Sequence, residues 1–246
     1  MRSVERCNSM ECAVWRWAIV ALAGATVGCV AVSEEGARVT VSSYFGYSVC
    51  GVQDLDGDGL ADIVASALGA SGERVGRNAQ RSGVVTALSS ASGRVLHATM
   101  GPSEWSGFGS CIETVGDVNG DGIQDVVVGS PGRVRDQRHG VGAVFILSGA
   151  TLSVMREVRA PENVRGFGYL CVRSGDRRGD GLGEILVSAS MPEAEVHTNV
   201  APRAFVVSAR SGAILCELHV PTQEVWRRLS IGGGLDFDGD GVGDVV

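Results

Sequence analysis

Asp54-Leu-Asp56-Gly-Asp58-Gly59-Leu-Ala-Asp62 is the stretch that decides the fold of this chain, because the same acidic pattern returns three more times. The first residues of successive copies are 63, 59 and 60 positions apart, and a repeat of that length indicates an array of similar structural units. We name the copies loop 1 to loop 4; the other three are Asp117-Val-Asn119-Gly-Asp121-Gly122-Ile-Gln-Asp125, Asp176-Arg-Arg178-Gly-Asp180-Gly181-Leu-Gly-Glu184 and Asp236-Phe-Asp238-Gly-Asp240-Gly241-Val-Gly-Asp244.

The composition of the loops is typical of a calcium site. Calcium takes about six to eight oxygen ligands in flexible geometry. Positions 1, 3 and 5 supply Asp or Asn with one exception, position 6 is a Gly suited to a sharp turn, and position 9 is an acid. The predicted ligands are the side chains of Asp54, Asp56, Asp58, Asp62, Asp117, Asn119, Asp121, Asp125, Asp176, Asp180, Glu184, Asp236, Asp238, Asp240 and Asp244, with the backbone carbonyls of Leu60, Ile123 and Val242.

Loop 3 departs from the pattern, because Arg178 replaces the acid at position 3. Its guanidinium could reach Asp176 and Asp180 and take the place of an ion. The sequence therefore predicts three competent calcium sites and one that is weak or empty.

Two other interpretations of the acidic loops are an EF-hand and a plain surface turn. An EF-hand loop needs a bidentate Glu at position 12, but that position is Ala65, Val128 or Val187, and a strand-like run follows each loop where the EF-hand has a helix. A plain acidic surface turn explains one copy more easily than four copies in register.

The rest of each repeat predicts a four-stranded unit. A Phe-Gly pair stands nine residues before the loop at Phe45, Phe108 and Phe167, whereas the fourth copy has Arg227-Arg228 there. Short Val/Ile/Leu runs bounded by Gly and Ser are typical of strands. They cover 63–65, 84–88 and 95–97, then 126–128, 143–147 and 152–155, then 185–187, 204–207 and 214–216. Four strands in about 60 residues are typical of a propeller blade.

The combination of Phe-Gly, acidic loop and the segments 65–67, 129–131 and 188–190 resembles the FG-GAP repeat of the integrin α-chain β-propeller and its bacterial relatives. The resemblance covers about residues 37–246. It implies an all-β propeller, calcium ligation by loops 1, 2 and 4, and a role in adhesion or recognition. The expected units lie near 45–98, 108–157, 167–219 and 227–246, about three and a half blades, so the propeller looks incomplete. One expected route to closure pairs residues 37–41 with the C-terminal strands.

Charge is distributed unevenly along the chain. The four loops hold 14 of the 28 acids and two of the 21 basic residues, a net −12, which leaves 19 Arg and 14 acids, a net +5, elsewhere. The acidity is concentrated where a cation would bind. No basic cluster favours nucleic acid as a partner.

The N-terminal segment 1–36 predicts export. Residues 18–32 form an apolar run preceded by Arg2, Arg6 and Arg16, which is short for a membrane span and typical of a secretory signal. Thr26-Val27-Gly28-Cys29 resembles a lipoprotein cleavage box, so a lipid anchor at Cys29 and release of a soluble protein are both open. Cys50, Cys111 and Cys171 lie five, three and four residues after their Phe. Because positions three and four point to opposite faces of a regular strand, we expect buried free thiols more than bridges.

No pattern for catalysis is present: the four His are isolated, and no nucleophile motif or phosphate-binding loop occurs. The sequence therefore predicts an exported, calcium-binding β-propeller that is not an enzyme and acts as a binding, adhesion or structural module for an unknown protein or carbohydrate at the cell envelope. The polar segments 68–81, 131–140 and 191–202 are the expected contact loops. The alternatives are the non-catalytic propeller of a truncated carbohydrate-active or hydrolytic enzyme, and a decayed gene product.

Overall fold

The computed structural model describes residues 44–68, 82–102, 106–132, 141–176, 178–189 and 203–218 with their side chains. It describes residues 29–32, 38–41, 233–235 and 244–245 by their backbone alone. Every regular element within these ranges is a β-strand, which confirms the predicted all-β class. These residues contain no helix long and apolar enough to cross a membrane.

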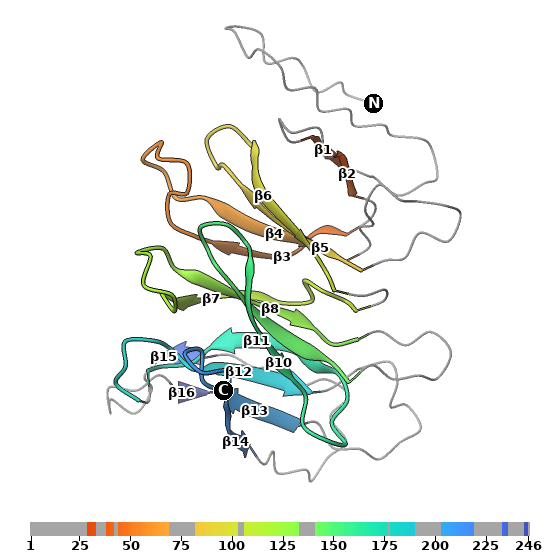
Figure 1. The fold of residues 1–246 in the computed structure, drawn as a ribbon, viewed down its shortest axis with the longest axis vertical. Coiled ribbons are helices and arrows are strands. Elements are labelled where there is room, and N and C mark those ends of the chain that lie inside the picture. Colours follow the sequence, from red (N-terminus) through yellow and green to blue (C-terminus); the bar gives the residue numbers. More distant parts are fainter. Residues whose placement is uncertain are drawn as a thin grey trace, which may run out of the picture.

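Three four-stranded antiparallel sheets, which we name blades 1 to 3, form the body of the molecule (Figure 1). In each blade the strands are hydrogen-bonded in chain order, so each is a simple meander. Blade 1 holds β3 (Phe45–Gly51), β4 (Ile63–Ala67), β5 (Val84–Leu88) and β6 (Val95–Met100). Blade 2 holds β7 (Ile112–Gly116), β8 (Asp125–Ser130), β9 (Ala143–Leu147) and β10 (Val154–Arg159). Blade 3 holds β11 (Phe167–Arg173), β12 (Ile185–Ala189), β13 (Arg203–Val207) and β14 (Ile214–Leu218).

Burial within a blade explains why the apolar runs become strands. The second and third strands of blade 2 are buried along their whole length, as continuous Val/Ile/Leu runs require, whereas the fourth strand is mostly exposed. Most strands run beyond the apolar stretch that predicted them, as β6 does by ending at Met100 where the prediction ended at residue 97, and one strand starts later than predicted. The fourth strand of blade 2 begins at Val154 and not at Leu152, because Leu152 lies buried in the preceding turn with φ 55°.

The Phe-Gly pairs join each blade to the one before it. Phe108 and Phe167 are fully buried, and each stacks edge-to-face on a Phe of the third strand of its own blade, with ring centroids 5.5 and 5.6 Å apart. Gly168 has φ 89° and lies against the carbonyl of Ala143 in blade 2, where a Cβ would not fit. A parallel bridge between Gly142 and Phe167 completes this junction. Phe45, in blade 1, is the exception, because its side chain is 41% exposed.

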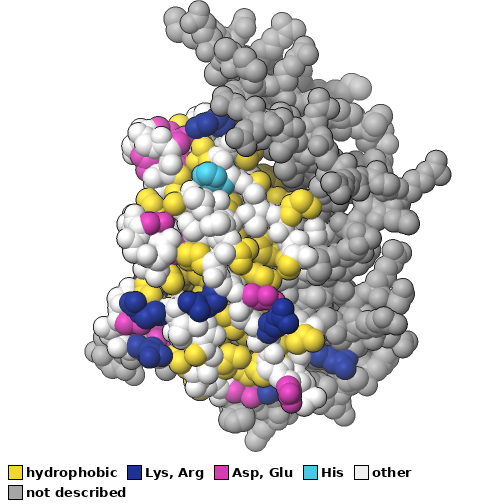
Figure 2. Space-filling view, viewed as in Figure 1, with side chains coloured by type: hydrophobic (Ala, Val, Ile, Leu, Met, Phe, Trp, Pro, Cys, Tyr) yellow, Lys and Arg dark blue, Asp and Glu magenta, His cyan; other side chains and the backbone are white. Residues whose placement is uncertain are grey.

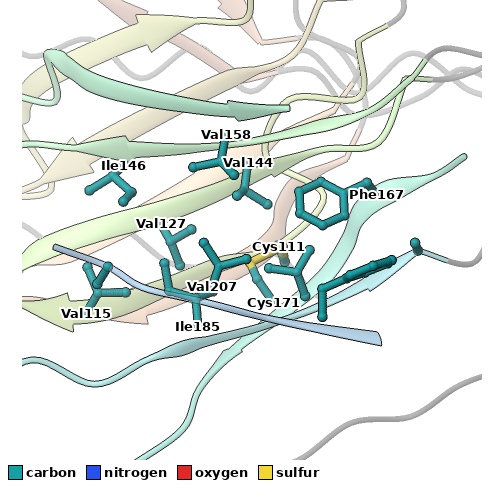
Figure 3. Close-up of a cluster of buried hydrophobic side chains, with 14 of the residues drawn as sticks. Cys111, Val115, Val127, Val144, Ile146, Val158, Phe167, Cys171, Ile185 and Val207 are labelled. Atoms are coloured by element: carbon teal, nitrogen blue, oxygen red, sulfur yellow. A yellow bond between two sulfur atoms is a disulfide. The ribbon is translucent and has the colours of Figure 1, made fainter. Parts of the chain in front are cut away.

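A disulfide between Cys111 and Cys171 crosses the junction of blades 2 and 3, with Cα atoms 5.7 Å apart (Figure 3). The expectation of buried free thiols is therefore wrong for this pair. Counting faces from the Phe fails because the first strand is irregular: the pairing register of β11 shifts between Phe167 and Cys171. Cys50 is free and half-buried, and burial raises the pKa of its thiol to about 12. Cys216 is free and exposed.

The two ends of the chain form smaller sheets. β1 (Cys29–Val32) pairs antiparallel with β2 (Arg38–Val41), so the predicted pairing of residues 37–41 with the C-terminal strands is wrong. β2 pairs with β1 because the two strands are close in the chain, and closing a short loop costs little entropy. β15 (Gly233–Leu235) pairs with β16 (Asp244–Val245) as the start of a fourth repeat. Most of the expected contact segments, the remaining signal residues and most of loop 4 lie outside the described residues.

Replacing Phe167 with Ala should lower the free energy of unfolding by about 3–5 kcal/mol, because it leaves a cavity at a fully buried junction. The matched change Phe45→Ala should cost under about 1 kcal/mol, because that ring is already partly in solvent. Urea unfolding followed by intrinsic fluorescence measures both. Equal losses for the two variants would contradict the blade junction described here.

Candidate metal-binding loops

Loops 1, 2 and 3 lie at the same place in their blades, between the first and second strands. In Figure 1 the three loops follow one another along the left edge of the stack of blades. Each is followed by a strand and not by a helix, which supports the exclusion of an EF-hand. The Gly at position 6 has φ of 89°, 86° and 82° at Gly59, Gly122 and Gly181, which an L-residue would adopt only with strain.

The Asp at position 1 organises each loop through its carboxylate. Asp54 Oδ1 accepts hydrogen bonds from the N–H groups of Gly57 and Asp58 at 2.7 and 3.2 Å, and its Oδ2 accepts one from Gly59 at 2.8 Å. Asp117 accepts from the same three positions of loop 2 at 2.6, 3.1 and 2.8 Å. The chain thus curls around one carboxylate in each loop.

These hydrogen bonds hold the pKa of the position 1 carboxyl below its usual 3.8. The largest cause is the backbone N–H of the position 6 Gly in all three loops: Gly59 for Asp54, Gly122 for Asp117 and Gly181 for Asp176. Hydrogen bonds to the ionised form stabilise that form, so these carboxyls stay charged.

Positions 1, 3 and 5 of loop 1 converge as predicted. Carboxylate oxygens of Asp54, Asp56 and Asp58 all lie within 4.8 Å of one another. Two oxygens that bind one calcium ion at about 2.3–2.6 Å cannot be much further apart than twice that distance, so this donor set fits calcium. In loop 2 the Asn119 amide donates to Asp121 Oδ2 at 2.9 Å, which places these two side chains together as well.

The position 9 acids, which are also predicted ligands, accept hydrogen bonds from backbone N–H groups, and Asp62 is not one of the three clustered carboxylates of loop 1. Asp62 is 1% exposed; its Oδ2 accepts from Leu55 N–H at 2.7 Å and its Oδ1 from Ser90 N–H at 3.0 Å. Asp125 repeats this with Val118 and Gly149, at 2.8 and 2.9 Å. Burial raises the pKa of Asp125 against the lowering effect of these hydrogen bonds. The position 9 acid therefore braces the loop against the turn between the third and fourth strands.

Loop 3 is held differently from the prediction. Arg178 contributes only its backbone N–H to Asp176, at 3.1 Å, and no ion pair from Arg178 to Asp180 is present among the described contacts. Arg210, in the turn between β13 and β14, pairs with Asp180 Oδ2 at 2.9 Å and also donates to the Asp180 carbonyl at 2.9 Å. Sequence reasoning missed Arg210 because it lies 30 residues from its partner.

The remaining predicted ligands are placed as follows. Glu184 is buried, as the other position 9 acids are, and its carbonyl accepts from Ser174 N–H at 2.8 Å. The N–H groups of Leu60, Ile123 and Leu182 donate to the position 5 carboxylates of their loops, at 2.8, 2.8 and 3.1 Å. In loop 4, Asp236, Asp238, Asp240 and Val242 lie outside the described residues, and Asp244 begins β16.

Known proteins match the chain over these same repeats. The FG-GAP repeat family matches residues 45–88 and 113–147, which cover most of blade 1 and the core of blade 2. Integrin alpha-PS5 of Drosophila melanogaster is 33% identical over 165 residues, 63% of this chain and 16% of that protein. Integrin alpha-M of Mus musculus is 34% identical over 120 residues, and integrin alpha-5 of Xenopus laevis is 36% identical over 115 residues. Each of these two matches spans 10% of the relative, so the shared part is a small portion of each integrin chain.

Asp117→Asn should make stability less dependent on acid pH. The pKa of Asp117 is lower in the folded chain than its usual 3.8, so its charge stabilises the fold above pH 3.8, and this contribution is lost as the pH falls through the folded pKa. Urea unfolding at a series of pH values in calcium-free buffer should show a shallower loss of stability for the variant below pH 3.8.

The control for this measurement is Glu157→Gln, which removes a carboxylate on β10 that is paired with Arg159 outside the loops. The same change of slope in both variants would contradict a special role for the Asp117 carboxylate.

Proposed function

We propose that this chain of FG-GAP repeats is an exported, non-catalytic binding module of the adhesion type, whose loops are stabilised by calcium. The observation that carries the proposal is the convergence of Asp54, Asp56 and Asp58 in a loop that recurs from blade to blade. The relationship to integrin α chains favours adhesion or recognition over catalysis. The same fold serves many functions, and its loops decide which ligand is bound. The experiments below therefore test which class of ligand this chain binds.

Calcium would be held in loop 1 by Asp54, Asp56 and Asp58, and in loop 2 by Asp117, Asn119 and Asp121. When bound, the ion supplies positive charge that neutralises carboxylates placed within a few ångströms of one another. The chain already curls each loop around its first Asp, so little ordering entropy is lost on binding. Loop 4 carries the same residue types and is proposed as a third site.

Export has support from the cross-linked junction of blades 2 and 3. Disulfides persist in oxidising compartments such as the cell surface and the periplasm. The bridge between Cys111 and Cys171 therefore fits the apolar N-terminal run at 18–32, which we propose as a secretory signal. The proposal leaves two forms of export open: a lipid anchor on Cys29, or release of the protein after cleavage of the signal.

The proposed mechanism is structural. Calcium and the position 9 acids would fix the turns between strands, and the longer connections between blade strands would present the contact surface. Among the described residues, Asp54, Asp56 and Asp58 are the one group of three or more His, Cys, Asp or Glu side chains that lie close enough together to hold a metal ion. The hydrolytic alternative has no comparable observation in its favour.

Calcium should raise the melting temperature, and chelation should lower it, because an ion that binds only the folded state stabilises that state by mass action. Asp121→Ala should remove about one bound calcium per chain, since it deletes the position 5 ligand of loop 2. Differential scanning fluorimetry and elemental analysis measure the two effects. The control Glu157→Ala removes a carboxylate from β10 and should leave both quantities unchanged. A melt that is the same in calcium and in chelator would contradict the proposal.

The binding role is tested with the whole chain applied to arrays of immobilised proteins and glycans. We expect retention on at least one of them in calcium and its loss in chelator, because the loops that shape the surface depend on the ion. Release of hydrolysis products from an arrayed glycan would instead support the hydrolytic alternative.

A further inference from the structure

We propose that Arg210 is a built-in cation for loop 3, so that blade 3 keeps its loop folded without a metal ion while loops 1 and 2 depend on calcium. The inference deepens the proposed function and rests on it for the calcium dependence of the other two loops. The contact itself stands on the geometry of blade 3.

The contact is made at two points. Arg210 Nε donates to the carboxylate of Asp180 and Nη2 donates to the carbonyl of the same residue, both at 2.9 Å. A planar guanidinium presents parallel donors, so it fixes both the side chain and the backbone of position 5. The other carboxylate oxygen of Asp180 accepts from Leu182 N–H at 3.1 Å, so both of its oxygens are engaged.

The other two blades offer an internal comparison. The same turn follows the third strand in each blade, closed by a hydrogen bond from the fifth residue to the first: Gly93 to Ser89, Leu152 to Ser148 and Gly212 to Ser208. At the place of Arg210 in this turn stand Ala91 and Ala150, which cannot pair with an acid. In Figure 2 basic side chains surround the acids of the lowest of the three loops, whereas the middle loop shows an acid with no basic side chain beside it.

The net charge of loop 3 also differs from that of loops 1 and 2. Loop 1 carries four acids and no base, and loop 2 carries three acids and no base. Loop 3 carries three acids and two Arg, and Arg210 brings its total to zero. A neutral loop gives a divalent cation little attraction. Loop 1 has an ion pair too, between Arg94 Nη2 and Asp56 Oδ2 at 3.7 Å, but one Arg against four acids leaves a net −3 there.

Arg210 is itself held in place from blade 2. Its carbonyl accepts a hydrogen bond from Arg156 Nη2 at 3.1 Å, and Arg156 extends from β10. Together with the disulfide, this contact couples blade 3 to blade 2 without an ion. Blade 3 is therefore the part whose local order should survive chelation.

Hydrogen exchange of the intact chain, read by mass spectrometry, tests the inference. In the unmodified protein, chelation should speed exchange in peptides covering 54–62 and 117–124 and leave 178–184 unchanged. Arg210→Gln should speed exchange of 178–184 about fivefold with or without calcium, because it removes the guanidinium contacts. The control Arg159→Gln removes a guanidinium on β10 that pairs with Glu157, and should change 178–184 less than twofold.

A second variant distinguishes loss of the Arg210 contact from general unfolding of the chain. Arg210→Lys keeps the charge but presents a point donor, so exchange of 178–184 should fall between that of the unmodified chain and that of Arg210→Gln. The inference is overturned if calcium slows exchange of 178–184 in the unmodified chain, or if Arg210→Gln and Arg159→Gln have the same effect on that segment. A failure of the calcium proposal would give a different result. Chelation would then leave the exchange rates of loops 1 and 2 unchanged, while Arg210→Gln would still speed exchange in loop 3.

Discussion

The structure depends on one arrangement that is repeated from blade to blade: an ionised Asp that draws backbone N–H groups of its own loop around it. At Asp54 and Asp117 these donors lie 2.6–3.2 Å from the carboxylate. Because the loop joins the first two strands, its shape sets how those strands enter the sheet. The buried position 9 acid accepts hydrogen bonds both from this loop and from the turn after the third strand. The acids at positions 1 and 9 together therefore link the first, second and third strands of a blade.

Packing between blades is the second interaction on which the structure depends. Phe108 and Phe167 are buried where one blade meets the preceding one, and the following Gly lets the two backbones approach. Hydroxyl groups add polar contacts at the same junctions: Ser48 Oγ accepts from Ile112 N–H at 2.9 Å, and Ser110 Oγ donates to the Gly168 carbonyl at 2.7 Å. No described buried side-chain nitrogen or oxygen lacks a hydrogen-bond partner, so these junctions bury polar groups without the usual cost.

The repeats share this framework but differ in how their loops and junctions are stabilised. Loop 1 gathers three carboxylates, loop 2 replaces one with Asn119, and loop 3 pairs Asp180 with Arg210. Blades 2 and 3 are also joined by the disulfide, which would stabilise the chain by about 4 kcal/mol if its effect is the lost entropy of a 60-residue loop. The same turn is thus fixed by different side-chain contacts from blade to blade.

Local patterns in the sequence were enough to predict the repeats, the strands and the loops. Alternation, turn residues and loop spacing act over a few residues, so the strands at 84–88 and 143–147 were predicted to the residue. The tertiary structure alone decided which distant groups meet. Cys111 bonds to Cys171 because an irregular first strand breaks the alternation that sequence reasoning assumes, and Arg210 reaches Asp180 because a turn 30 residues away folds against the loop. The position 9 acids Asp62 and Asp125 likewise accept hydrogen bonds from the N–H groups of Ser90 and Gly149, which lie 28 and 24 residues further along the chain and which residue identity alone does not predict.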